Sequence, residues 1–74
     1  MTRVYGQGQV LIAGPGWADE VTGLTKGREY VAQLVFTSPD GSTVREVAVD
    51  NDRGHLRLFP ASAFTIKQEG APAP

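Results

Sequence analysis

The sequence lacks cysteine altogether and holds a single histidine, His55. Without cysteine there is no disulfide and no thiolate metal site. A metal bound by one imidazole would need further convergent ligands, and a serine nucleophile would need that imidazole and an orienting acid nearby. No residue spacing indicates either arrangement. The sequence therefore predicts no enzyme, no catalytic residue, no metal and no cofactor, and His55 is expected to be exposed at the start of a strand.

Excess charge and long apolar runs are also missing. Seven Lys and Arg residues against eight Asp and Glu give a net charge of −1, whereas proteins that coat nucleic acid usually carry a basic excess. No apolar run has the length of a membrane-spanning helix, and residues 1–6 lack the apolar segment of a signal peptide. These features predict a cytoplasmic protein that does not associate with membranes and disfavour general nucleic-acid binding.

The length of 74 residues allows one domain. Its expected range is residues 3–68, followed by a flexible Pro/Ala-rich tail, residues 69–74. A folding unit of this size buries only about 60% of its unfolded surface, so the expected core is thin.

Apolar residues recur at period two, and Gly or Pro interrupts every longer stretch, which predicts strands rather than helices. The predicted strands are residues 4–13, 28–37, 42–50, 55–59 and 64–67. Turns are expected at Ser38–Gly41 and at Asp50–Gly54, and a single 3₁₀ turn at Ala61–Ala63. We therefore expect an all-β fold, most simply a five-stranded SH3-like barrel, since a closed barrel leaves few unpaired edges.

Alternation within the second predicted strand assigns its side chains to two faces. The face expected to be buried carries Tyr30, Ala32, Leu34 and Phe36, and the face expected to be exposed carries Val31, Gln33, Val35 and Thr37. In the third strand Val47 and Val49 are expected to point inward and Arg45 outward. A one-residue error in register would exchange these faces.

Three segments resemble a group of short phage and prophage proteins with SH3-like barrels. They are the Leu24–Tyr30 segment, with Leu, Gly and Tyr at spacings of three, the Asp50–Gly54 turn, and Phe59-Pro60 followed by Phe64. The resemblance covers about residues 21–67 and implies a phage-type accessory protein, in a group whose functions are mostly unknown. Signalling SH3 domains are less similar, since the third predicted strand opens Ser42-Thr43-Val44 without the tryptophan of a polyproline groove.

A calcium-binding interpretation of Asp50, Asn51 and Asp52 is weaker than a turn, because an EF-hand loop needs alternating ligands and a glutamate at its twelfth position. Gly6-Gln7-Gly8 and Gly14-Pro15-Gly16 are likewise expected to be turns or bulges and not phosphate-binding loops.

The function expected from these observations is non-enzymatic protein binding, on a host or phage protein. The candidate contact residues are Trp17, Phe59, Pro60, Arg57, Val31 and Val35. Trp17 has a second interpretation, as a cap over one end of the core. Val31 and Val35 would serve docking or self-association as a homodimer.

Two alternatives stay open. A nucleic-acid-associated barrel would use a local basic strip of Arg45, Arg53, Arg57 and Lys67. A small structural component of a virion or another assembly would appear as a defined oligomer.

Overall fold

The computed structural model describes residues 4–67, which form six strands and one 3₁₀ helix. The elements are β1 (Val10–Ala13), β2 (Glu29–Val31), β3 (Leu34–Thr37), β4 (Val44–Asp50), β5 (Leu56–Pro60), η1 (Ala61–Ala63) and β6 (Phe64–Ile66). Within this range no helix is long and apolar enough to cross a membrane. The predicted domain boundaries at residues 3 and 68 and the predicted tail, residues 69–74, lie outside the described residues.

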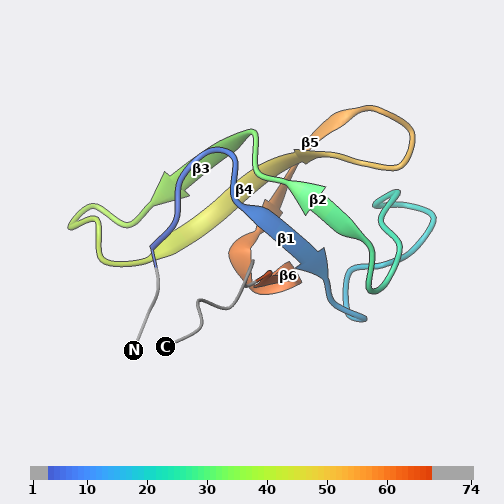
Figure 1. The fold of residues 1–74 in the computed structure, drawn as a ribbon, viewed down its shortest axis with the longest axis horizontal. Helices are drawn as coiled ribbons and strands as arrows, with labels where there is room; N and C mark the ends of the chain where they lie inside the picture. The colour runs from blue at the N-terminus through green and yellow to red at the C-terminus, as the bar shows by residue number, and fades with distance from the viewer. Residues whose placement is uncertain (1–3, 68–74) are drawn as a thin grey trace, which may run out of the picture.

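The strands form two antiparallel sheets of three strands each. The first has the order β2-β1-β6 and the second the order β3-β4-β5. Figure 1 shows the chain passing from β2 in the first sheet directly into β3 in the second. The all-β prediction is confirmed, but the described residues contain six strands where the sequence predicted five.

The core lies between the inner faces of the two sheets. Its large members are Leu11, Leu24, Tyr30, Val47, Val49, Phe59 and Phe64, with small Ala13, Ala32 and Ala63 among them. The Phe64 ring meets the rings of Phe59 and Tyr30 edge-on, with centroids 5.9 and 6.1 Å apart. The inward directions predicted for Val47 and Val49 are confirmed, as both side chains are fully buried. Arg45 is exposed, as expected.

The second predicted strand, residues 28–37, is split because two neighbouring amides bond to different sheets. The Ala32 N–H donates to the Gln9 carbonyl at 2.9 Å, next to β1, and the Gln33 N–H donates to the Ala48 carbonyl of β4 at 2.8 Å. At this step the inward-pointing positions shift from even-numbered to odd-numbered residues. Tyr30 and Ala32 are buried as predicted, but Val35 is the residue of β3 that packs against the core.

Three of the predicted face assignments are therefore wrong. Leu34 and Phe36 were expected to be buried and instead are 49% and 46% exposed. Val35 was expected to be exposed and instead is partly buried against the core. The alternation rule holds on either side of Gln33, and the error arises because it was carried across a break in the strand.

Residues 4–9 do not belong to the first strand, contrary to the prediction. Gly8 has a φ of +95°, and the Gln9 N–H donates to the Gly6 carbonyl at 3.2 Å, which closes a turn before β1. The other predicted segments match their strands to within two residues, and η1 lies at Ala61–Ala63 as predicted. The turn at Ser38–Gly41 is confirmed by the Gly41 N–H, which donates to the Ser38 carbonyl at 2.8 Å.

We expect Leu11→Ala to destabilise the domain by about 2–5 kcal/mol, because it empties space at a fully buried position of a core that small domains cannot spare. The matched control is Leu58→Ala, a strand leucine that is 52% exposed and should cost less than about 1 kcal/mol. Denaturant unfolding followed by circular dichroism measures both. Equal losses in the two variants would contradict the packing described here.

Candidate functional site

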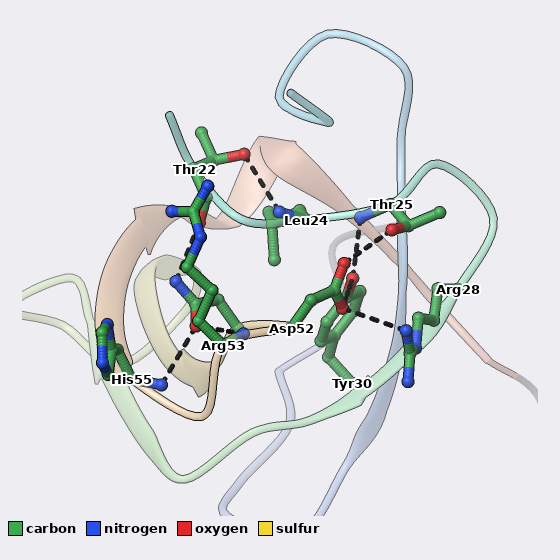
Figure 2. A network of polar contacts seen from close by, with 9 residues as sticks. Thr22, Leu24, Thr25, Arg28, Tyr30, Asp52, Arg53 and His55 are labelled. Atoms are coloured by element: carbon green, nitrogen blue, oxygen red, sulfur yellow. Dashed lines mark hydrogen bonds and ion pairs between the residues drawn. The ribbon is translucent and has the colours of Figure 1, made fainter. Parts of the chain in front are cut away.

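A network of hydrogen bonds joins the long loop after β1 to the turn between β4 and β5 (Figure 2). The Asp52 carboxylate accepts from the Thr25 hydroxyl at 2.6 Å and from the Tyr30 hydroxyl at 2.7 Å. The Tyr30 hydroxyl in turn accepts from the Thr25 N–H at 2.7 Å, and Arg28 lies 3.4 Å from the carboxylate. The network therefore holds the end of the loop, where the chain enters β2, against the turn between β4 and β5.

Asn51, which is 5% exposed, anchors the same turn from inside. Its side-chain amide donates to the Thr22 carbonyl at 3.2 Å, and its side-chain oxygen accepts from the backbone N–H groups of Arg53 and His55 at 2.9 and 3.0 Å. A Cβ at Gly23, where φ is +74°, would come within 2.6 Å of that amide. The predicted turn at Asp50–Gly54 is confirmed, and the side chains of Asn51, Asp52 and Arg53 form hydrogen bonds within the fold.

The hydrogen bonds and burial in this network shift the pKa values of Asp52 and Tyr30. Hydrogen bonds from Thr25 and then Tyr30 lower the pKa of Asp52, while burial raises the pKa of the Tyr30 hydroxyl. Within residues 4–67 no group of three or more His, Cys, Asp or Glu side chains could hold a metal ion. His55 is exposed, at the start of the β5 region. We interpret the network as structural support for the loop and the turn.

The outer face of the second sheet carries four of the exposed large apolar side chains of the described residues. Strand register places Leu34, Ala48 and Leu58 in one row across β3, β4 and β5. Phe36 lies with Glu46 and Pro60 in the row on one side of it, and Leu56 lies opposite Asp50 in the row on the other side. We call the four large apolar side chains Leu34, Phe36, Leu56 and Leu58, with Ala48 between them, the outer apolar face.

These four side chains remain between 46% and 52% exposed, and they are neighbours on one sheet rather than scattered residues. If a large apolar side chain exposes about 150–200 Å² when free, four half-exposed ones present roughly 300–400 Å². A contiguous patch of that size marks a binding site in many monomeric proteins. The outer apolar face is therefore the candidate functional site.

The contact residues proposed from sequence do not lie together on this face. Phe59 is a core residue and 4% exposed, and Pro60 is partly buried. Trp17 is 41% exposed and meets Phe59 edge-on with centroids 6.5 Å apart, so it both covers the core and presents surface. Arg57 is exposed but lies opposite Val49, in a row whose side chains face away from the outer apolar face.

Val31 and Val35, which the sequence predicted to share one exposed face, lie on different sheets. Val31 is 45% exposed on β2 of the first sheet, whereas Val35 packs against the core from β3 of the second. The structure therefore does not place the pair on one exposed face.

The basic strip of the nucleic-acid alternative is partly engaged within the protein. Lys67 pairs with Glu29 at 2.7 Å, and the Arg53 guanidinium donates to the Glu20 carbonyl. Arg45 and Arg57 are exposed on β4 and β5. Two of the four cations are thus held by internal bonds.

Sequence reasoning missed the outer apolar face, although one signal was present. The stretch Leu56-Arg57-Leu58-Phe59 puts large apolar residues on both faces of a single strand, so one face had to remain outside a core this thin.

Compared with protein-family models, with curated proteins and with solved structures, the chain matches none of them.

The lowered pKa of Asp52 predicts a pH-dependent stability. A carboxyl group whose folded pKa is depressed contributes stability above its unfolded value of 3.8, and that contribution is lost as pH falls through the folded pKa. We expect Asp52→Asn to be less stable than the wild type at pH 7 and the difference to shrink below pH 3.8. Urea unfolding midpoints from pH 7 to pH 2 measure it.

Asp40 does not confuse this comparison. Hydrogen bonds from Ser38 and Ser42 lower its pKa to about 2, and they are the same in both proteins. A difference in stability that stays constant from pH 7 to pH 2 would show that the Asp52 charge does not stabilise the turn.

Proposed function

We propose that this chain is a non-enzymatic protein-binding module that docks on another protein through the outer apolar face. The observation that carries the proposal is the exposure of Leu34, Phe36, Leu56 and Leu58 as neighbours on one sheet. Burial of half-exposed leucine and phenylalanine side chains is favourable at about 25 cal/mol per Å² of apolar area. The free energy of burying this apolar area therefore favours binding of a partner that covers the face.

We further propose that the two sheets form an SH3-like barrel. Supporting this are the two three-stranded antiparallel sheets, the chain that leaves one sheet at Ala32 and enters the other at Gln33, and a 3₁₀ turn before the last strand. The docking surface lies on the outside of one sheet. It is therefore a different surface from an aromatic polyproline groove.

The proposed biological setting is a phage or prophage accessory protein acting in a host cytoplasm, and it rests on the sequence resemblance to short phage proteins. Fold alone does not decide function, so the setting adds no argument for the site itself. The site is supported by the exposure of its four large apolar side chains and by the strand register that makes them neighbours.

The test is a pull-down from bacterial lysate at low and high salt. We expect a specific protein to be retained at high salt by the wild type and to be lost with Leu34→Thr/Leu58→Thr, because two apolar contacts in the same row become polar. Threonine keeps strand propensity, and circular dichroism confirms folding of the variant.

The matched control is Val21→Thr, which makes the same kind of change at a loop residue that is 78% exposed and off the sheet. This variant should retain the partner. Retention by the double leucine variant, or recovery of nucleic acid alone at low salt only, would contradict the proposal.

A further inference from the structure

Two carboxylates border the outer apolar face along its middle strand. Glu46 and Asp50 lie two residues to either side of Ala48 on β4, so all three point to the same face. Both acids are exposed, and neither forms an ion pair with another of the described residues. Four residues of strand separate them by about 13 Å. An apolar centre with a negative charge at each end therefore favours a cationic partner.

A second copy of this chain fits the face poorly. When two identical sheets pack with their strands aligned, a two-fold axis along β4 sets Glu46 against its own copy, and an axis across β4 sets Glu46 against Asp50. Either arrangement brings like charges together, which disfavours the contact. The apolar area of roughly 300–400 Å² is also at most half of the ~800 Å² of total surface that each partner contributes to an ordinary stable interface. Membranes and nucleic acids, both anionic, meet the same repulsion.

The partner's backbone must satisfy its own hydrogen bonds over this face. Leucine and phenylalanine side chains offer no donors or acceptors, so an extended segment lying on them would leave its N–H and C=O groups unpaired. A helix pairs those groups internally, and a helix lying on a sheet is one of the common packed layers of proteins. Helical rise is about 1.5 Å per residue, so residues seven apart lie on one face about 10–11 Å apart.

We infer, building on the proposed protein-binding function, that the outer apolar face takes an amphipathic helix of a partner protein that carries basic residues two turns apart with apolar residues between them. In that arrangement the apolar residues at i+3 and i+4 cover Ala48 between Leu34 and Leu58. The basic residues at i and i+7 reach Glu46 and Asp50, with the flexible lysine or arginine stem covering the remaining few ångströms. The apolar contact supplies affinity, and the two charge pairs select the partner and its position.

The test uses three helical peptides of equal length that share apolar residues at i+3 and i+4. They carry Lys, Gln or Glu at both i and i+7, and their helicity is matched by circular dichroism. Titration into the ¹⁵N-labelled full chain, followed by amide chemical shifts, gives each dissociation constant and the surface contacted. We expect shifts on β3, β4 and β5. The Lys peptide should bind roughly three- to tenfold tighter than the Gln peptide, from two exposed charge pairs, and the Glu peptide should bind most weakly.

Variants assign that preference to named residues. Glu46→Gln and Asp50→Asn should each reduce the preference for the Lys peptide, and together they should reduce it to less than about twofold. Glu20→Gln, which removes an exposed carboxylate in the loop after β1, is the matched control and should leave the preference unchanged. Raising the salt concentration should narrow the difference between the peptides, since exposed charges are screened.

Failure of this inference can be told apart from failure of the proposed function. Equal binding of the three peptides, or no binding up to millimolar concentration while a leucine-dependent partner is still retained from lysate, would overturn the helix inference alone. A concentration-dependent dimer that Leu34→Thr/Leu58→Thr weakens would assign the face to a second copy and also overturn it. Peptide binding that is unaffected by the double leucine variant would overturn both the helix inference and the use of this face for docking.

Discussion

The arrangement of the two sheets depends on the step at Ala32 and Gln33, where the chain leaves the first sheet and enters the second. Adjacent N–H groups donate to Gln9 beside β1 and to Ala48 on β4, so this short segment bonds to both sheets. A domain with few large core residues needs both inner faces to enclose them. The same step reverses which residues of β3 point inward, and as a result Leu34 and Phe36 are exposed. One backbone feature therefore links the two sheets and exposes the side chains of the candidate site.

Several residues that carry the sequence resemblance have structural roles in the core and in the loop after β1. Leu24, Tyr30 and Phe64 are core residues, Gly27 has a φ of +80°, and Asp52 binds the Tyr30 hydroxyl. Their shared pattern therefore reports how the loop after β1 is held against the β4–β5 turn. Only Asp50 and Pro60 among the residues of the resemblance lie in the rows of the outer apolar face, so the pattern reports the fold and not a partner. A resemblance built from such residues indicates fold, while the function has to be argued from the surface.

Sequence reasoning predicted the parts of the fold that are decided locally. Pro39 and Gly41 predict a turn by their own backbone preferences, and alternation correctly buries Val47 and Val49 within β4. The break at Gln33 could not be predicted in this way, because it is decided by hydrogen bonds to Gln9 and Ala48, which are distant in sequence. The error in the site followed directly, since a shift of one residue exposes Leu34 and Phe36 and turns Val35 toward the core.

The outer apolar face is not explained by folding stability. Polar residues at Leu34, Phe36, Leu56 and Leu58 would leave the core between the sheets unchanged, because all four side chains point away from it. They would also remove a hazard, since exposed apolar strands favour aggregation. Glu46 and Asp50 reduce that hazard by opposing the stacking of one copy on another, while leaving the face open to a partner of opposite charge. Glu46 and Asp50 form no ion pair within residues 4–67, and the cationic, apolar partner proposed above would account for both these carboxylates and the exposed leucines beside them.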